Sequence, residues 1–204
     1  MIAIIDYGVG NLFSLQSSFA MIGQDVTVTS DKAVIANADR LILPGVGAFG
    51  DARKKLAQSG LDDVLLAQAK DGKMIMGICL GMQMLFDKSF GYGEHKGLSL
   101  IPGEVVDMTP RIRAGLKVPH IGWNALDMQK PEHPLFKYVK NGDCVYFVHS
   151  FFADLCKEHT IATSEYDIPL TAAVAKDNVI GCQFHPEKSG RVGLNLLKAF
   201  CEMK

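Results

Sequence analysis

The sequence predicts one α/β domain over residues 1–204, a single-domain three-layer fold whose central, mainly parallel β-sheet is flanked by helices. In the first half, apolar segments of strand length alternate with amphipathic segments of helix length, which is typical of a covered parallel sheet. In the second half, strand-like segments follow one another with turn residues between them, so extra antiparallel strands are expected there. A chain of 204 residues is long enough for one well-packed core.

The expected elements of the first half follow from their apolar patterns. Strands are expected at residues 1–6, 25–30, 40–45 and 73–78. Helices are expected at residues 12–23 and 51–70, with a break near Ser59 and Gly60, and another helix begins at residue 80. In this order, helices connect the first strand to the second and the third strand to the fourth, and another helix follows the fourth strand.

The second half is expected to close the sheet and form the working face. Strands are expected at residues 104–108, 143–151, 160–166, 170–177 and 179–184, and a closing amphipathic helix at 192–203. Residues 90–97 and 109–124 are expected to be loops. In such folds, loops at the carboxyl ends of strands carry the chemistry.

Charge and composition exclude several classes of function. The formal net charge is −1 and no long basic run occurs, so nucleic acid and membrane surfaces are not expected partners. Asp6 interrupts the apolar N-terminus too early for a signal peptide, and no apolar run is long enough to cross a bilayer. Five cysteines without a C-x-x-C pair favour free thiols, a cytoplasmic protein and no metal site.

Cys79 lies in the segment GICLG, directly after the apolar run of residues 73–78. A sharp turn from a strand into a helix, with glycine on both sides, is the geometry of a nucleophile elbow. The backbone N–H groups at a helix N-terminus favour a negatively charged sulfur. A buried cysteine in a glycine-rich turn is the alternative interpretation.

His185 and Glu187 provide a base and a group to orient it. They follow a strand-like segment in the sequence QFHPE, and residues two apart in an extended segment point the same way. Together with Cys79 they would complete the nucleophile, base and orienter of a catalytic triad. A surface histidine beside a surface glutamate is the alternative.

The segment LPGVGAF at residues 43–49 predicts a glycine-rich loop at the end of a strand. Backbone N–H groups at Val46 or Gly47, together with that of Leu80 after the nucleophile, would form an oxyanion hole. A plain turn is the alternative. The segment IDYGVGN lacks the third glycine of a dinucleotide-binding loop, so no nucleotide cofactor is expected.

Taken in order, six segments resemble a known family: IDYGVGNLFSL, LPGVGAF, GICLGMQMLF, HIGWN, YFVHSF and QFHPEKSG. They resemble the glutamine amidotransferases with a Cys-His-Glu triad, and more narrowly the glutaminase subunits of imidazole glycerol phosphate synthase in histidine biosynthesis. The resemblance extends over residues 1–204. It implies that Cys79 forms a thioester with glutamine, that His185 transfers the proton and that Glu187 orients His185.

The resemblance also implies substrate and partner contacts. Gln83, His149 and Ser150 would bind the glutamine, and no cofactor or metal is implied. Ammonia would pass to a (β/α)8-barrel cyclase subunit, which makes imidazole glycerol phosphate and aminoimidazole carboxamide ribonucleotide. The residues implied at or near the interface with this partner are Asn11, His120, Trp123, Tyr146 and Lys188. Nothing is carried over to the loop of residues 88–96.

Two alternatives stay open at this point. The chain would instead be a related glutaminase that feeds ammonia to another synthase, serving sugar modification, chorismate or pyridoxal phosphate chemistry. Outside the enzymes, a non-catalytic binding protein on the same fold would also carry an elbow cysteine. The presence of both His185 and Glu187 favours an enzyme.

Overall fold

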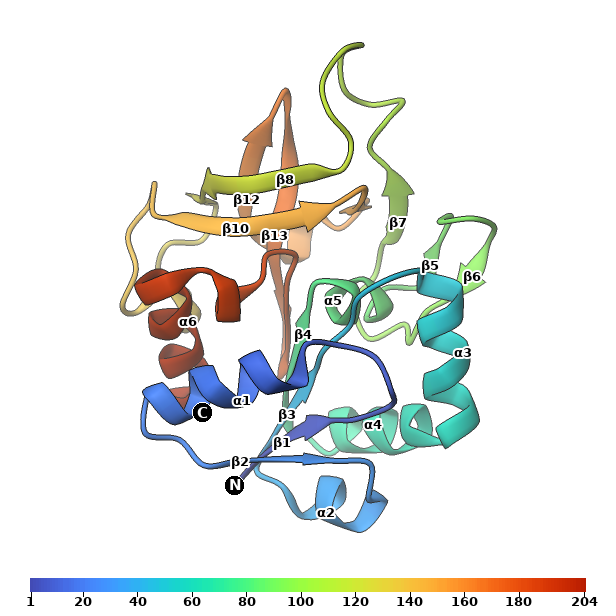
Figure 1. Ribbon diagram of the computed structural model, residues 1–204, viewed down its shortest axis with the longest axis vertical. Helices are drawn as coiled ribbons and strands as arrows, with labels where there is room; N and C mark the ends of the chain where they lie inside the picture. Colours follow the sequence, from blue (N-terminus) through green and yellow to red (C-terminus); the bar gives the residue numbers. More distant parts are fainter.

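The computed structural model describes residues 1–204 and contains one large sheet with helices on both faces (Figure 1). The eight-stranded sheet has the order β2-β1-β3-β4-β14-β13-β12-β9. Its parallel part comprises β1 (Ile2–Ile5), β2 (Val26–Thr29), β3 (Arg40–Leu43), β4 (Met74–Ile78) and β14 (Val179–Cys182). Its antiparallel part adds β13 (Ile168–Lys176), β12 (Thr160–Tyr166) and β9 (Asp127–Met128). The predicted fold class is confirmed.

Helices cover both faces of the parallel strands. In Figure 1, α1 (Leu12–Met21) and α6 (Gly190–Glu202) lie to the left of the sheet, and α3 (Phe49–Ser59) and α4 (Leu61–Lys70) lie to the right. The short helix α2 (Lys32–Asn37) lies at the bottom. Gly60 has a φ of 64°, and this left-handed residue ends α3 and begins α4 where the sequence predicts a break.

Alternation along the central strands divides the core into two layers. Ala3 and Ile5 belong to the cluster that includes residues of α2, α3 and α4, whereas Ile2 and Ile4 belong to the cluster with α1 and α6. Because successive strand residues point to opposite faces, every residue of such a strand is buried when both faces are covered. The four residues of β1 are all buried, which explains their continuous apolar sequence.

Two smaller sheets lie above the carboxyl ends of the parallel strands. One has the order β11-β7-β5-β6, and the other pairs β8 with β10 (Figure 1). Their strands are β5 (Lys88–Ser89), β6 (His95–Lys96), β7 (Glu104–Asp107), β8 (His120–Ala125), β10 (Cys144–His149) and β11 (Phe151–Asp154). Three single turns of 3-10 helix complete the chain: η1 (Pro134–Phe136), η2 (Lys157–His159) and η3 (Pro186–Lys188).

The structure corrects several expected boundaries. The helix that begins at Leu80, α5 (Leu80–Met84), has only 5 residues, and the chain continues into β5. Residues 120–124 lie in β8 instead of a loop, and the strand expected at 143–151 divides at Ser150 into β10 and β11. Helix α2 was not expected. Its N-cap, Asp31, accepts hydrogen bonds from the N–H groups of Ala33 and Val34 at 2.7 and 3.2 Å.

No helix in the structure has both the length and the apolar character needed to span a membrane.

Candidate active site

Cys79 occupies the sharp turn between β4 and α5. Its backbone has φ 54° and ψ −111°, a conformation that costs a non-glycine residue about 1–3 kcal/mol and that tends to occur at functional sites. Two backbone hydrogen bonds hold it there. The Cys79 N–H donates to the Cys182 carbonyl at 2.8 Å, and the Cys79 carbonyl accepts from the Gln83 N–H at 3.1 Å. The surrounding strands therefore impose the strained turn that the sequence predicts.

Glycines around this turn permit a close approach of three backbone segments. A Cβ atom on Gly77 would lie 2.7 Å from the Gly81 carbonyl oxygen, and one on Gly81 would overlap the Leu43 carbonyl oxygen at the end of β3. A Cβ on Gly45 would lie 2.8 Å from the Gly81 nitrogen. The glycines that frame Cys79 are thus required by packing, because any side chain there would separate the elbow from the loop after β3.

His185 reaches Cys79 from the neighbouring strand. β14 runs parallel to β4 with Cys182 opposite Ile78, so the segments that follow both strands leave the same edge of the sheet. The His185 N–H donates to the Tyr146 carbonyl at 2.9 Å, and the Ser189 hydroxyl donates to the His185 carbonyl at 2.6 Å. The His185 side chain is 3% exposed, so packing holds the ring while the two backbone hydrogen bonds hold the residue in place.

Glu187 accepts a hydrogen bond at Oε1 from the His185 Nδ1 over 2.8 Å. The predicted contact is present, but the expected extended backbone is not, because residues 186–188 form a turn of 3-10 helix. Burial lowers the pKa of His185, but its hydrogen bonds to Cys79 and Glu187 and their negative charges outweigh burial and raise that pKa to about 9. With Nδ1 bonded to Glu187, Nε2 is the ring nitrogen left for Cys79.

A cavity of about 480 Å³ opens at Cys79. Its walls come from the loop after β3, the elbow, the segment after β5 and the end of β10. The lining residues are Val46, Gly47, Ala48, Cys79, Leu80, Gln83, Tyr92, Pro119, Val148, His149, Ser150, Phe151 and His185. The structure therefore brings together the expected nucleophile, base, oxyanion-loop and substrate residues.

The loop expected to form the oxyanion hole lies against the elbow. The N–H groups of Val46 and Gly47 donate no hydrogen bond within the chain. The Val46 side chain is 43% exposed, and Gly47 has a φ of 91°, which glycine adopts without strain. The Tyr7 hydroxyl donates to the Pro44 carbonyl at 2.7 Å and anchors the start of this loop. Burial raises the pKa of Tyr7, so the hydroxyl keeps its proton.

The three expected substrate residues line the cavity, but two of them also bind the protein itself. Gln83 is buried, and its Nε2 donates to the Phe151 carbonyl at 3.0 Å and to Gln183 Oε1 at 2.9 Å. Only its Oε1 is left for a ligand. Both ring nitrogens of His149 are also within hydrogen-bond distance of protein atoms, the Phe151 carbonyl and His120. Ser150 is half-buried at the rim.

Three of the expected interface residues gather on one exposed area, here called the outer ribbon face, made by Ile121, Trp123, Tyr146 and Lys188. Trp123 is 58% exposed and contacts Tyr146 edge-on with ring centroids 6.1 Å apart. The Lys188 ammonium lies 5.8 Å from the centroid of the Tyr146 ring. Asn11 is half-buried at the N-cap of α1, whose residues contact η3.

His120 does not belong to the outer ribbon face. It was expected near the interface, but its side chain is only 3% exposed. His120 and Trp123 are three residues apart in β8, so they project to opposite sides of the strand. His120 instead pairs across the ribbon with His149 on the inner side.

Gln183 is a site residue that the sequence reasoning missed. Its buried side chain accepts from Gln83 and donates from Nε2 toward the Cys79 sulfur over 3.7 Å. Gln183 stands two residues before His185 in the same extended segment, so the alternation argument used for Glu187 would have placed Gln183 beside His185. Tyr92 was missed because its loop carries no motif, yet it lines the cavity and contacts Phe151 with ring centroids 5.7 Å apart.

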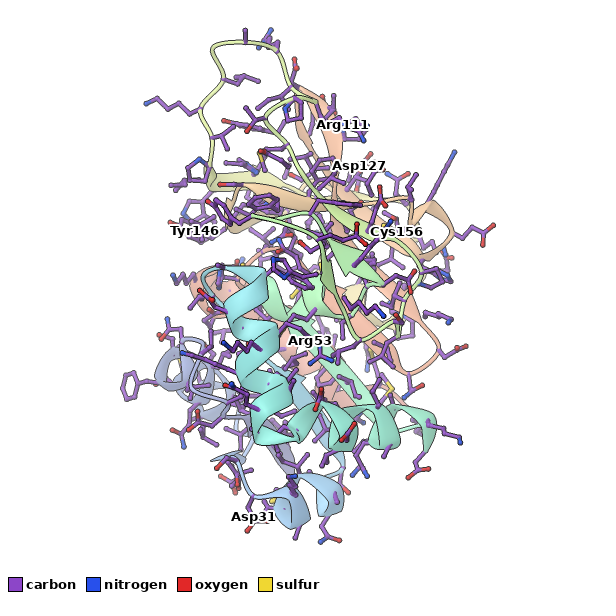
Figure 2. The ribbon with its side chains drawn as sticks, turned by 90° about the vertical axis from the view of Figure 1, so that its right-hand side faces the viewer. Asp31, Arg53, Arg111, Asp127, Tyr146 and Cys156 are labelled. Atoms are coloured by element: carbon purple, nitrogen blue, oxygen red, sulfur yellow. The ribbon has the colours of Figure 1, made fainter.

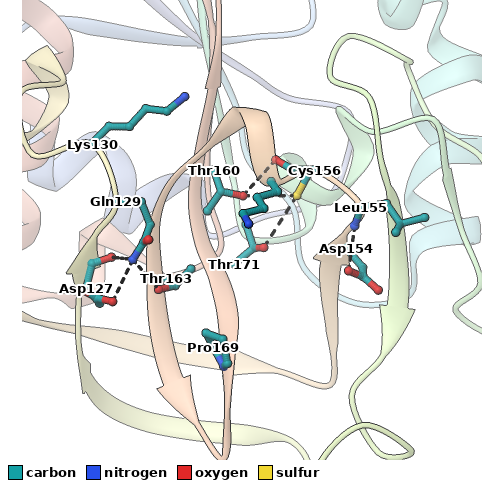
Figure 3. Close-up of a pocket in the computed structure, with 11 residues that line it drawn as sticks. Asp127, Gln129, Lys130, Asp154, Leu155, Cys156, Thr160, Thr163, Pro169 and Thr171 are labelled. Atoms are coloured by element: carbon teal, nitrogen blue, oxygen red, sulfur yellow. Dashed lines mark hydrogen bonds between the residues drawn. The ribbon is translucent and has the colours of Figure 1, made fainter.

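A second, larger cavity lies elsewhere, on the antiparallel half of the sheet. Figure 3 shows this groove of about 750 Å³ beside Cys156, whose sulfur lies 3.7 Å from the Thr160 hydroxyl and 3.8 Å from the Thr171 hydroxyl. Two lysines and two aspartates line it together with threonines, but no histidine does. Size alone would therefore select the wrong cavity for the chemistry.

Comparisons with known proteins agree with this geometry. The sequence matches the family described as Glutamine amidotransferase class-I over residues 3–203. It is similar to solved structures that share the fold: a glutamine amidotransferase (TM-score 0.76, 18% identity, 99% of this chain and 98% of that one) and PurLQS from Thermotoga maritima (TM-score 0.75, 18% identity, 98% and 96%).

Curated relatives are more similar in sequence. The imidazole glycerol phosphate synthase subunit HisH of Caldanaerobacter subterraneus subsp. tengcongensis is 48% identical and aligns with 100% of this chain and 98% of its own length. The subunit HisH of Lacticaseibacillus casei is 49% identical, with 100% and 96% aligned. The chain therefore belongs to the class-I glutamine amidotransferases and, within them, to the HisH subunits of imidazole glycerol phosphate synthase.

Proposed function

We propose that this chain hydrolyses glutamine at Cys79 and delivers the ammonia to the cyclase subunit of imidazole glycerol phosphate synthase. One observation supports the chemistry above all others. His185 lies between Cys79 and the buried Glu187 carboxylate, at the joined carboxyl ends of β4 and β14. That arrangement supplies a nucleophile, a proton carrier and a group that orients the carrier.

In the first step, the Cys79 sulfur, with its proton already transferred to His185, attacks the side-chain amide carbon of glutamine. The carbon–sulfur bond forms as the carbonyl π electrons move onto oxygen, and the tetrahedral intermediate then expels ammonia. Because its pKa is about 9, the His185 ring holds a proton at neutral pH, so the proton that the departing ammonia requires is already in place. The products of this step are the γ-glutamyl thioester and ammonia.

In the second step, water attacks the thioester and releases glutamate. His185 is now neutral and takes a proton from the water, and the sulfur leaves as a thiolate that regenerates the starting pair. The Glu187 contact at Nδ1 keeps Nε2 directed toward the reacting atoms in both steps.

The negative oxygen of each tetrahedral intermediate needs N–H donors. We assign the Leu80 N–H, the first after the nucleophile, and the N–H of Val46 or Gly47 from the loop that packs on the elbow. The absence of internal partners for the Val46 and Gly47 N–H groups supports this assignment. Val46→Pro removes one donor and should lower turnover by about 10²–10³-fold with little change in glutamine binding, measured by steady-state kinetics.

The partner is proposed to be a (β/α)8-barrel cyclase that docks on the outer ribbon face and near Asn11. An exposed tryptophan beside tyrosine and lysine is typical of an interface anchor. Five free thiols favour a reducing compartment, so the proposal places both subunits in the cytoplasm.

Labelling with a reactive glutamine analogue, 6-diazo-5-oxonorleucine, tests the nucleophile. We expect one equivalent bound at Cys79, located by mass spectrometry of peptides, and protection by excess glutamine. Label on Cys144 or Cys201 with Cys79 unmodified would overturn the assignment.

Reconstitution tests the partner. Mixed with the cyclase subunit and its ribonucleotide substrate, the chain should form a one-to-one complex whose glutaminase rate exceeds that of the chain alone. Trp123→Ala should weaken the complex by at least about 10-fold, while labelling of Cys79 in the isolated chain stays unchanged. If the chain formed no complex and its rate were not stimulated, the partner would instead be sought among synthases of sugar modification.

A further inference from the structure

Two buried histidines face each other across the β8–β10 ribbon without a role in the reaction above. His120 and His149 are directly opposed in the antiparallel register and are 3% and 6% exposed. The His120 Nδ1 lies 3.1 Å from the His149 Nε2, and the His149 Nδ1 lies 2.9 Å from the Phe151 carbonyl oxygen. His149 lines the cavity at Cys79, whereas His120 does not.

These contacts allow only one assignment of the ring protons. A carbonyl oxygen only accepts, so the His149 Nδ1 must carry a proton and donate to Phe151. Burial, and to a smaller degree the charges of His120 and His185, lower the pKa of His149 to about 4, so the ring is neutral and its Nε2 accepts. The His120 Nδ1 must then carry a proton and donate it to His149.

The hydrogen bonds continue from His149 to the nucleophile. The same Phe151 carbonyl that accepts from His149 also accepts from the Gln83 Nε2 at 3.0 Å. Gln83 donates in turn to Gln183, whose Nε2 lies 3.7 Å from the Cys79 sulfur. One connected network therefore runs from β8 through the wall of the cavity to Cys79.

The other end of the network lies beneath the outer ribbon face. His120 is held between the rings of Phe147 and Tyr166, with centroids 5.0 and 4.2 Å away. The same strand carries Trp123 and Ile121, both 58% exposed, on its opposite side. A displacement of β8 from outside would therefore move the donor on which the His149 tautomer depends.

We propose that His120 is a positioning residue that fixes the proton of His149 on Nδ1 and thereby couples the outer ribbon face to the wall of the glutamine cavity. The proposal rests on the proposed glutaminase function of that cavity. Without the His120 donor, the His149 proton is free to move to Nε2. The Phe151 carbonyl would then lose the hydrogen bond from His149 and keep only the one from Gln83. The wall of the cavity at Gln83 and Phe151 would be held less firmly.

Two substitutions separate the hydrogen bond from the packing. His120→Phe keeps a ring between Phe147 and Tyr166 but removes the donor, and His120→Asn keeps a donor near the place of Nδ1. In complex with the cyclase subunit, we expect His120→Phe to lower kcat/KM for glutamine by roughly 10- to 100-fold, mainly through KM. We expect His120→Asn to recover to within about threefold of the parent. His133→Phe, at a half-buried histidine that contacts η1, is the matched control and should leave kcat/KM unchanged.

Nitrogen NMR of the histidine rings reports the His149 tautomer, which would not change if His120 only supported the packing. In the parent chain, the His149 signals should show a protonated Nδ1 and an unprotonated Nε2, and in His120→Phe they should shift toward a mixture of tautomers. A parent His149 that carries its proton on Nε2 would overturn the proposal even if the variants failed to fold. Equal kinetic loss in His120→Asn and His120→Phe, with the His149 signals unchanged, would overturn it as well.

The NMR result also distinguishes this proposal from the proposed function. If glutamine analogues failed to label Cys79 while the tautomer behaved as expected, the glutaminase assignment would fail and the histidine pair would stand. If Cys79 were labelled but the His149 tautomer did not change in His120→Phe, the glutaminase assignment would stand and the proposal for the histidine pair would fail.

Discussion

Two buried cysteines line two cavities in this chain, and their neighbours differ in a way that decides their chemistry. Cys79 stands in a strained turn at the carboxyl ends of parallel strands and lines the same cavity as His185. Cys156 lies beside the larger groove on the antiparallel half, and the hydroxyls of Thr160 and Thr171 lie within hydrogen-bond distance of its sulfur (Figure 3). Burial raises the pKa of the Cys156 thiol, and no histidine lines the groove to take its proton.

Cys156 also lies away from the outer ribbon face. In Figure 2, Tyr146 of the outer ribbon face and Cys156 lie toward opposite sides of the upper half. What identifies the nucleophile is that the ends of neighbouring strands meet beside it. Neither the volume of a cavity nor the burial of a thiol distinguishes the two cysteines in this way. The nucleophile and its base follow the neighbouring parallel strands β4 and β14, whose carboxyl ends lie at the same edge of the sheet.

The largest expected effect separates the two cysteines directly. Cys79→Ala should lower the glutaminase rate of the complex by at least about 10⁴-fold, because the covalent route is lost. Cys156→Ala should stay within about twofold of the parent, since a neutral thiol of this kind contributes packing. A coupled assay for glutamate release compares the two variants. A large loss of glutaminase activity in a fully folded Cys156→Ala variant would contradict the difference proposed between the two cysteines.

A second prediction concerns the carboxylates near each cavity. Glu187→Gln should lower kcat by about 10²–10³-fold, because the group that orients His185 loses its charge. The pKa of His185 should also fall below about 9, as followed by proton NMR, because the Glu187 charge helps to raise it.

Asp154→Asn is the matched control beside Cys156, where the carboxylate pairs with Arg111 at 3.2 Å and accepts a hydrogen bond from the Leu155 N–H at 2.8 Å. It should change neither kcat nor the titration of His185. An Asp154→Asn loss as large as that of Glu187→Gln would contradict the assignment.

The pH dependence of stability should differ between the two cavities. The pKa of His149 falls from 6.5 to about 4 on folding, so its contribution is present above pH 6.5 and is lost as the pH falls through 4. That shift corresponds to roughly 3 kcal/mol, so His149→Asn should flatten the loss of unfolding free energy between pH 6.5 and 4.

Thr171→Val beside Cys156 provides the control, because a hydroxyl does not titrate in this range. Its unfolding free energy, measured by urea denaturation at several pH values, should run parallel to that of the parent. A parallel profile for His149→Asn as well would show that His149 is not buried in its neutral form.

The smallest effect concerns two glycines, one beside each cysteine. A Cβ on Gly81 would overlap the Leu43 carbonyl oxygen, and one on Gly103 would lie 2.9 Å from the Asp154 carbonyl oxygen. Both Gly81→Ala and Gly103→Ala should therefore lower the free energy of unfolding by about 1–3 kcal/mol. At a temperature where both remain folded, only Gly81→Ala should lower kcat, because only Gly81 shapes the turn of Cys79.

Much of the fold could be read from residue patterns, because burial on both faces leaves a continuous apolar run in each parallel strand. Residues 73–78 and 179–184 were identified in this way as strands, and the structure places β4 and β14 there. The patterns failed where contacts between distant segments override local preference. Residues 120–124 pair with β10 and become β8, although their own sequence resembles a loop.

The sequence by itself determined the elbow. Glycine on either side of Cys79, an apolar strand before it and the segment HPE elsewhere were enough to predict a nucleophile, a base and an orienting carboxylate, because these features are local in the chain. Only the tertiary structure decided that Gln183 joins Gln83 to Cys79, that His120 faces inward and that both nitrogens of His149 are occupied. Those contacts join segments far apart in sequence. The register of β8 against β10 sets the histidine pair, and the register of β4 against β14 places Gln183 beside Cys79.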